Sequence, residues 1–326
     1  SINDGLGGTG NITLSGVGDI STPKIGITGT VDIGHTNTGS VTLKGTAYNI
    51  DGATTITTTD AADKIIIAGA MTIKTAGDDV LFVDGGITLN DDKNLTITAG
   101  AGDVTLTAIG GHSSEVIDIE GATVTAAVIG NADEIKSVKL DGSTKVILGG
   151  NITTSNISGN NVDIDGAVEL TAATVTIDTS ANNGSINFDS SIDSDTGEAR
   201  NLVLKAKGGN ITVTGKIGVT DGLGTLKIND GYASGVGVIA LGGIGNSGNV
   251  GVDSTADIGD TGTTGIDLSG GYYNIGGATT FTTAANDGAS PANTDIIDFE
   301  EATTLKTSGD NISFVGGGIS AAANGA

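Results

Sequence analysis

Short triplets, apolar at both ends and mostly polar in the middle, recur along this sequence. Residues 41–43 read VTL, residues 95–97 read LTI, and residues 211–213 read ITV. Side chains alternate between the two faces of a strand, so this spacing predicts short strands with one buried face. The β-branched residues that fill the triplets also favour strands. Further triplets of this kind are residues 12–14, 71–73, 87–89, 104–106, 138–140, 162–164, 175–177, 186–188, 202–204 and 226–228.

Clusters of Gly, Asn and Asp separate the triplets, for example at residues 85–86, 149–150 and 182–184. These residues readily take the positive φ angles of tight turns. Because no apolar 3.6-residue period lasts beyond two turns, we expect no helix. Two or three strands per coil would give β-solenoid coils of roughly 20 to 25 residues, and therefore about 13 to 16 coils. An up-and-down barrel or an array of sandwiches is the alternative, although it would need hairpin turns and more aromatic residues.

The chain also repeats itself over long distances. Residues 31–58 match residues 256–283 at 16 of 28 positions. After a seven-residue insertion, residues 70–87 match residues 302–319 at 11 of 18 positions. Repetition at a fixed period is the sequence signature of a stacked architecture, in which each unit buries its apolar face against its neighbours.

A shorter period lies within the long one. The related segments NIDGA, DIDGA and NIGGA begin at Asn49, Asp163 and Asn274. They indicate three diverged units of roughly 110 residues, at about 1–110, 111–218 and 219–326, of which the third resembles the first. We therefore expect an all-β fold, a parallel β-helix (β-solenoid) that forms a single continuous domain over residues 1–326. Val, Ile, Leu and Ala would fill its interior, and Thr, Asp, Asn and Lys would cover its exterior.

The composition of the chain limits the classes of partner that we expect it to bind. The chain has 56 Gly, 2 Pro, no Cys and 3 % aromatic residues, and its formal net charge is −24 with Arg200 as the only arginine. Nucleic acids and anionic membranes bind through Lys and Arg, so neither is an expected partner. An acidic surface would instead favour solubility and could collect divalent cations. No apolar run approaches the roughly 18 residues of a membrane span, and no signal peptide is visible, so we expect no membrane insertion.

Several segments carry a resemblance to a known group of proteins. NLTITAGAGDVTLTAIGG at residues 94–111 and NLVLKAKGGNITVTGKIG at 201–218 run strand, small-residue turn, strand, and LGGNITTSN at 148–156 and AVELTAATVTID at 167–178 are similar. In these segments the sequence resembles the repetitive β-helical shafts of bacterial filamentous-haemagglutinin-like and autotransporter-type surface proteins. The resemblance implies a secreted, right-handed, single-stranded β-helix that serves as a stalk, adhesin or surface coat.

Residues for nucleophilic catalysis are scarce. The chain has no Cys, and its two histidines, His35 and His112, lie in different repeat units. His35 is replaced by Asp260 in the matching repeat, which argues against a triad or a histidine metal site there. Turn histidines are the simpler interpretation.

Paired carboxylates could still hydrolyse glycosidic bonds, since hydrolases need two acids at a fixed separation. Candidates are Asp163 with Asp165, and the group Glu115, Asp118 and Glu120. Asp163 and Asp165 would share one face of a strand, but so do the acidic ladders of an exposed surface. We therefore expect no enzymatic activity, and a polysaccharide-active β-helix enzyme remains the alternative.

The strongest candidate for a metal site is the segment DSSIDSDTGE at residues 189–198. Asp193, Asp195 and Glu198 offer oxygen ligands around Gly197, which could supply a tight turn for calcium. The simpler interpretation is a polar inserted loop. A second insertion, at residues 285–294, occurs only in the last repeat. Because loops inserted on one face of a solenoid often bind partners, this is the expected place for partner contacts.

These observations predict an extracellular structural or adhesive shaft of a bacterial cell-surface filament, adhesin or coat. No cofactor is required, although calcium is possible. Neither end shows an obvious cap, so we expect that the chain continues into more repeats or self-associates into a filament or surface layer. Contacts with glycans or proteins of a host or neighbouring cell are a further expectation. A cation-bridged, S-layer-like lattice is a second alternative to the plain shaft.

Overall fold

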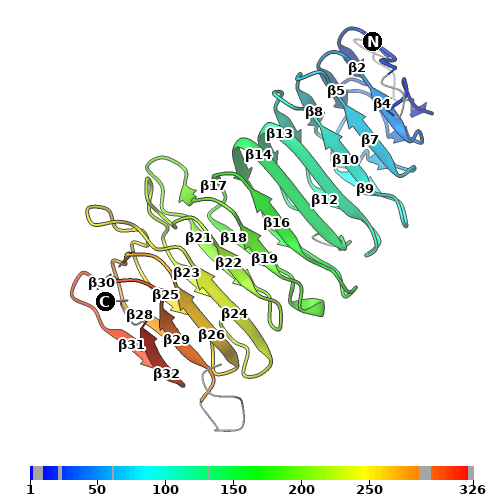
Figure 1. Ribbon diagram of the computed structural model, residues 1–326. Helices are drawn as coiled ribbons and strands as arrows, with labels where there is room; N and C mark the ends of the chain where they lie inside the picture. The colour runs from blue at the N-terminus through cyan, green and yellow to red at the C-terminus, as the bar shows by residue number, and fades with distance from the viewer. Residues whose placement is uncertain (3–9, 21–23, 61, 131–132, 286–294, 322–326) are drawn as a thin grey trace. The chain divides into compact units, whose positions relative to one another are not determined.

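The computed structural model describes residues 1–2, 10–20, 24–60, 62–130, 133–285 and 295–321. The described residues are all β, with parallel sheets stacked as a β-solenoid of about 12 turns (Figure 1). Among them there is no α-helix, and one 3-10 turn, η1, covers Ser180–Asn182. The predicted fold class is confirmed. Parallel pairing of successive coils is incompatible with the barrel or sandwich of hairpins.

The chain forms two compact units, Ser1–Ile157 and Ser158–Ala326. In the first unit, three columns of parallel strands run through successive coils. One column consists of β2 (Val31–Ile33), β5 (Thr54–Thr57), β8 (Val80–Val83) and β11 (Val104–Leu106). A second consists of β1 (Ile12–Leu14), β3 (Val41–Leu43), β6 (Ile65–Ile67), β9 (Ile87–Leu89) and β12 (Ile109–Gly110). A third consists of β4 (Ala47–Asn49), β7 (Met71–Lys74) and β10 (Leu95–Thr98).

Two long strands, β13 (Val116–Ala126) and β14 (Ser137–Leu148), each extend the first and third columns together. The chain turns the corner between the columns at Gly121 and Gly142, beside a shift in register. A Cβ atom on Gly142 would lie 2.2 Å from the Lys145 carbonyl oxygen, so only glycine fits this corner. The second column continues through a bridge at Ile129 to β15 (Ile152–Thr153).

The second unit has the same three-column plan. Its longest column consists of β16 (Val162–Asp165), β19 (Ile186–Phe188), β22 (Ile211–Val213), β24 (Val236–Leu241), β26 (Thr263–Leu268), β29 (Ile296–Phe299) and β32 (Gly318–Ala321). Another consists of β18 (Thr174–Asp178), β21 (Asn201–Lys205), β23 (Leu226–Ile228), β25 (Ala256–Ile258), β28 (Thr279–Thr282) and β31 (Ile312–Val315). The third consists of β17 (Val168–Leu170), β20 (Ile192–Ser194), single bridges at Ile217 and Ile244, β27 (Tyr272–Asn274) and β30 (Thr304–Lys306).

The number of coils is lower than predicted because several coils are longer than the sequence pattern suggests. In the first column of the first unit, Val104 pairs with Val124 across a shorter coil. Thr54 pairs with Val80 across a longer one. In the second unit, the pairs Ile211↔Ile239 and Ile266↔Ile297 span coils that are longer still. The paired strands keep their parallel register in these longer coils.

Apolar residues stack in register in the interior of each unit. Val41, Ile65 and Ile87 follow one another in the second column of the first unit, and all three are buried. The residues between them along each strand face outward and are only partly buried. All thirteen predicted triplets lie within strands. The alternation of side chains therefore places one face of most strands in the aliphatic core of their unit.

The sequence repeat is preserved in side-chain contacts. The Thr58 hydroxyl donates a hydrogen bond to the Asp63 carbonyl oxygen at 3.3 Å. The matching Thr283 hydroxyl donates to the Asp295 carbonyl oxygen at the same distance. Each threonine is buried and joins the end of its strand to the chain just before the next one. The repeats therefore share this side-chain hydrogen bond as well as strand positions.

Candidate functional site

The segment at residues 189–198, which was the calcium candidate, is partly a strand. Ile192, Asp193 and Ser194 form β20, and the chain leaves the coil only after Ser194. Asp193 faces outward on this strand, and Ser194 faces the interior, where it is buried. The turn that follows contains Gly197 at φ 80°, a conformation that favours glycine.

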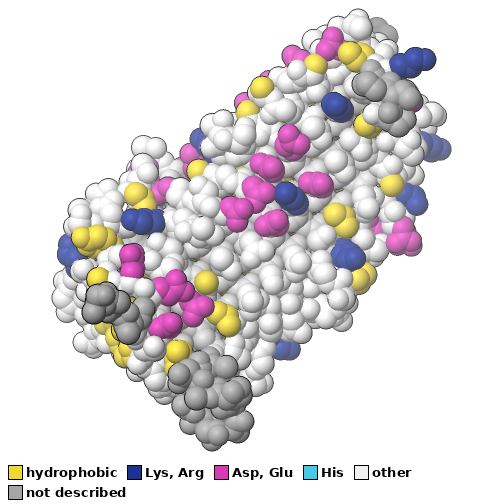
Figure 2. All heavy atoms as spheres, in the orientation of Figure 1, with side chains coloured by type: hydrophobic (Ala, Val, Ile, Leu, Met, Phe, Trp, Pro, Cys, Tyr) yellow, Lys and Arg dark blue, Asp and Glu magenta, His cyan; other side chains and the backbone are white. Residues whose placement is uncertain are grey.

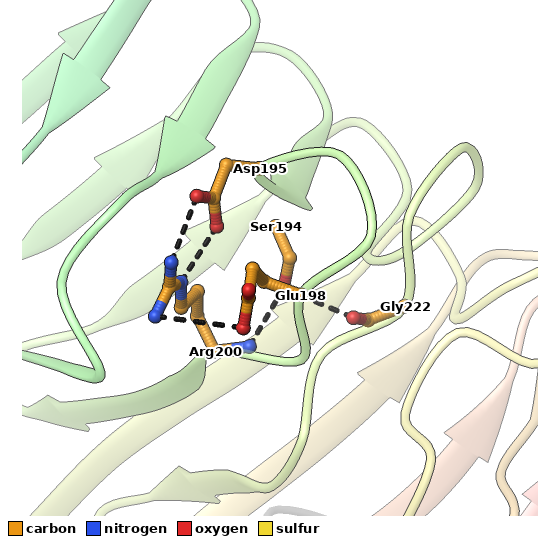
Figure 3. Close-up of polar contacts among 5 residues, drawn as sticks. All are labelled: Ser194, Asp195, Glu198, Arg200 and Gly222. Atoms are coloured by element: carbon orange, nitrogen blue, oxygen red, sulfur yellow. Dashed lines mark hydrogen bonds and ion pairs between the residues drawn. The ribbon is translucent and has the colours of Figure 1, made fainter.

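Arg200 closes this turn by binding Asp195 (Figure 3). The Arg200 Nε atom donates to Asp195 Oδ1 at 2.6 Å, and Nη2 donates to Oδ2 at 2.8 Å. Glu198 lies on the same guanidinium, with its Oε2 3.9 Å from Nη1. Two parallel charge-assisted hydrogen bonds fix the geometry of such a pair. The hydrogen bonds from Arg200 lower the pKa of the Asp195 carboxyl, and the same pair raises the pKa of Arg200.

Ser194 ties the turn to the next coil. Its hydroxyl donates to the Gly222 carbonyl oxygen at 2.9 Å and accepts the Arg200 N–H at 2.9 Å (Figure 3). A buried hydroxyl between two backbone groups satisfies both and excludes water from the turn. The Ser194 hydroxyl therefore contacts both the backbone of Arg200 and the next coil.

Asp193 binds a backbone N–H group of the next coil, at the same boundary between two coils. Its Oδ1 accepts the Thr220 N–H at 2.8 Å. The Asp221 N–H lies 3.4 Å from the same oxygen, which makes that contact the weaker of the two. The carboxylate thus satisfies a backbone N–H of the neighbouring coil, beside the hydrogen bond that the Ser194 N–H donates to the Asp221 carbonyl oxygen at 3.1 Å.

The three predicted calcium ligands are therefore engaged in different contacts. Asp195 and Glu198 lie on Arg200, whereas Asp193 binds the backbone near Thr220. Calcium takes six to eight oxygen ligands, so it would have to displace the guanidinium from both Asp195 oxygens. In the part of the chain that the structure describes, no group of three or more His, Cys, Asp or Glu side chains could hold a metal ion. Calcium at these residues stays a prediction.

The carboxylates that were considered for hydrolysis are divided between the two faces of the coil. Glu115 is buried, and its carboxylate accepts the His112 N–H at 2.6 Å and the Asp92 N–H at 3.1 Å. Asp118 and Glu120 lie on the outward face of β13 and are exposed. Glu115 therefore closes a turn and does not face these two acids.

Asp163 and Asp165 share the outward face of β16, as the alternation predicts. Asp163 is in register with Asn187 of the next coil. The two acids thus lie on one face, as a polysaccharide-active enzyme would require. That alternative function stays a prediction.

Both histidines lie in turns. The His35 N–H donates to Thr38 Oγ1 at 2.8 Å, and the Asp260 N–H donates to Thr263 Oγ1 at 2.9 Å in the matching repeat. The backbone contact is thus independent of the side chain at position 35 or 260. His112 is exposed, and its Nδ1 lies 2.9 Å from the Leu89 carbonyl oxygen. Residues 286–294, most of the second predicted insertion, lie outside the described residues.

One pair of acidic residues on adjacent strands, called the acidic rung below, was not predicted from the sequence. Asp267 of β26 and Asp298 of β29 are register partners on the outward face. Burial raises the pKa of Asp267, and the charges of Glu300 and Asp298 raise it further. Among the residues that the structure describes, Oδ1 of Asp298 is buried and has no hydrogen-bond partner. Figure 2 shows acidic side chains gathered over the C-terminal strands of this unit.

Fold and contacts together define a repetitive parallel β-solenoid whose polar side chains satisfy its turns. No protein-family profile matches the sequence, and no curated protein matches it. Among the described residues, no helix has the length and apolar character needed to cross a membrane.

Proposed function

We propose that this chain is a structural and interaction module, an extracellular β-solenoid shaft of a bacterial surface filament, adhesin or coat. The observation that supports this most strongly is the in-register stacking of strands in three columns within each unit. A strand between two others is hydrogen-bonded on both sides, and its inward side chains pack against two coils. Such stacking resists bending and gives rigid length.

The chemistry of the candidate site also supports a structural role. Asp195 binds Arg200, Asp193 accepts a backbone N–H, and buried Glu115 accepts two more. Each of these carboxylates stabilises a turn between strands. Polar groups used in this way determine where a coil bends and let the coils differ in length.

The proposed location rests on the acidic composition and on the resemblance to bacterial surface shafts. A net charge of −24 keeps a long exposed protein soluble and limits non-specific association. Partners would then be further shafts of the same kind, or glycans and proteins of a neighbouring cell.

Protease treatment of intact cells tests this proposal. The full reading frame that contains the chain would be produced with an epitope tag placed in the turn at Gly197, whose Cβ position is open to solvent. We expect loss of the tagged band when intact cells are treated, as in lysed cells, and antibody labelling without permeabilisation. Protection of the tag in intact cells, with cleavage only after lysis, would contradict a surface location.

The acidic rung favours a second candidate, a lattice in which cations bridge neighbouring shafts. Asp267 and Asp298 are adjacent like charges, and a divalent cation would relieve their repulsion. Chelation with EDTA should then disperse assemblies, and calcium should restore them. Assemblies that are equally stable with and without the chelator would exclude the lattice and leave the plain shaft.

A further inference from the structure

Asn94 and Asn210 each precede a strand and bind the next coil through the amide oxygen alone. Asn94 Oδ1 accepts the Val116 N–H at 2.9 Å, and Asn210 Oδ1 accepts the Val238 N–H at 3.0 Å. In the part of the chain that the structure describes, the Nδ2 atom of each side chain has no hydrogen-bond partner. Both residues are exposed. The fold therefore uses the oxygen of each amide and leaves the nitrogen available.

A threonine follows each of these asparagines by two positions. Residues 94–96 read NLT, and residues 210–212 read NIT. The middle residue of each segment is buried in the core of its unit. Side chains alternate along an extended chain, so Thr96 of β10 and Thr212 of β22 share the outward face with the asparagine before them. An asparagine with Ser or Thr two positions later, and no Pro between them, is the acceptor motif of N-linked glycosylation.

Asn161 shows that the contact between coils does not require this motif. Its Oδ1 accepts the Ser185 N–H at 2.9 Å, and the residue is exposed like the other two. The residue two positions later is Asp163, on the outward face of β16. The same hydrogen bond to the next coil thus occurs with and without a hydroxyl at the second position. Asn161 is therefore a matched control within the chain.

The motif also occurs elsewhere in the sequence, always at an exposed asparagine. Described coils pair on both sides of β10 and of β22, so the surroundings of Asn94 and Asn210 are defined. These two sites therefore carry the inference. The other copies of the motif begin at Asn11, Asn151, Asn156, Asn183 and Asn311.

We propose that Asn94 and Asn210 are acceptor sites for N-linked glycosylation, with a diphosphate-activated sugar as the donor. A bond forms between Nδ2 and the anomeric carbon of the sugar, while the bond from that carbon to the diphosphate oxygen breaks. Nδ2 loses one proton to a base of the transferring enzyme, and the diphosphate leaves with the electron pair. Oδ1 is unchanged by this step, so the hydrogen bond to the next coil persists.

This proposal deepens the structural role proposed above and rests on it, because it gives a surface shaft a hydrated sugar coat. A glycan is bulky and solubilising, and it is tolerated only where the modified atom faces solvent. The outward faces of β10 and β22 meet that condition without loss of a contact between coils.

Mass spectrometry of peptides from the chain, purified from the cells that naturally produce it, tests the proposal. We expect the added mass of one or more sugar residues at Asn94 and Asn210, and none at Asn161. Thr96→Val removes the hydroxyl but keeps the branched shape, so it should abolish the modification at Asn94 and leave Asn210 modified. Asp163→Thr completes the motif at Asn161 and should add a sugar there. Circular dichroism melting of each variant shows whether it is folded.

Cell fractions distinguish the two sources of activated sugar. Transfer to the unmodified recombinant chain by a soluble fraction supplied with nucleotide sugars identifies a nucleotide-linked donor. Transfer by the membrane fraction alone identifies a lipid-linked donor.

Unmodified Asn94 and Asn210 in the protein from its natural source overturn the proposal, wherever the protein is located. A sugar on Asn161 of the parent chain also overturns it, as does a sugar that persists on Asn94 in Thr96→Val, because the motif would then not direct the transfer. Protease treatment of intact cells reports the location separately. A modified chain that is protected in intact cells would contradict the surface location and support the glycosylation sites.

Discussion

The phenol of Tyr273 donates a hydrogen bond to the carbonyl oxygen of Leu241, 32 residues earlier, at 2.6 Å. The ring is fully buried, and the same hydroxyl accepts the Gly270 N–H at 3.2 Å. Tyr48 repeats the contact in the first repeat, with Leu14 as its acceptor at 3.0 Å. A buried tyrosine thus joins the corner of one coil to the strand of the coil before it. Burial raises the pKa of Tyr273, so this hydroxyl stays protonated at neutral pH.

Replacement of Tyr273 by Phe should destabilise the second unit by about 1–3 kcal/mol, because the Gly270 N–H would stay buried without a partner. Tyr272→Phe is the control, since Tyr272 is exposed on the opposite side of β27. Urea unfolding of the two variants measures the difference. An equal shift in both midpoints would contradict the assigned role of the hydroxyl.

Glu115→Gln should cost about 1.5–3 kcal/mol, because the buried carboxylate accepts hydrogen bonds that include two backbone N–H groups. The amide would place a donor against one of those donors. Glu120→Gln, at an exposed position of β13, should change the free energy of unfolding little. Thermal unfolding of both variants provides the comparison, and an unchanged melting temperature for Glu115→Gln would refute the interpretation.

The repeat supplies a matched pair of core substitutions. Ile87→Ala should cost about 2–4 kcal/mol, because it leaves a cavity between two coils. Ile319→Ala, at the matching but exposed position, should cost less than about 1 kcal/mol. Denaturant unfolding of the two variants measures the difference. Equal costs for the two substitutions would contradict the difference in burial between Ile87 and Ile319.

The Asp195–Arg200 pair should contribute stability in a defined pH range. The pKa of Asp195 is lowered in the folded chain, so the unfolded carboxyl binds its proton at higher pH than the folded one. The contribution is therefore present above the ordinary carboxyl pKa and is lost as the pH falls through the lowered value. Melting temperatures of the parent chain and Asp195→Asn should differ slightly at pH 7 and converge in strong acid. A difference independent of pH would contradict this assignment.

The pKa of Asp267 is shifted in the opposite direction, so its effect on stability has the opposite pH dependence. Its pKa is raised, so the folded chain holds the proton more tightly, and stability falls as the pH rises through the raised pKa. Asp267→Asn should stabilise the second unit by about 0.5 kcal/mol at pH 7, because like charges face each other across the rung. The gain should disappear at low pH. A loss of stability at pH 7, measured by urea unfolding, would mean that the acid is favourably paired.

The sequence predicted the local structure well because side-chain alternation is a local property. The triplet at 138–140 was correctly predicted as a strand, but its extent was not. It lies within β14, which runs from Ser137 to Leu148 through a corner at Gly142. Glycines usually end strands, so only the close approach of the Lys145 carbonyl oxygen shows why the chain bends there and continues.

At the candidate site, the sequence identified the acids but missed their partners. Arg200 was recognised as the only arginine, and its position shortly after Asp195 was the available signal. The contact of Ser194 with Gly222 had no signal, because it joins residues of two different coils. The same holds for Asp267 and Asp298, whose adjacency depends on the exact length of the intervening turns.

By itself, the sequence determined that the chain consists of short one-sided strands, that glycine-rich turns separate them, and that the first part returns at the end. These features are encoded by residues within a few positions of each other, or by plain repetition. Only the tertiary structure decided which strands stack in each column and which carboxylates bind backbone or Arg200. The reason is physical: coil register is set by packing between strands that lie a whole coil apart in the chain, and the spacing between register partners varies from coil to coil, so the local strand pattern does not reveal it.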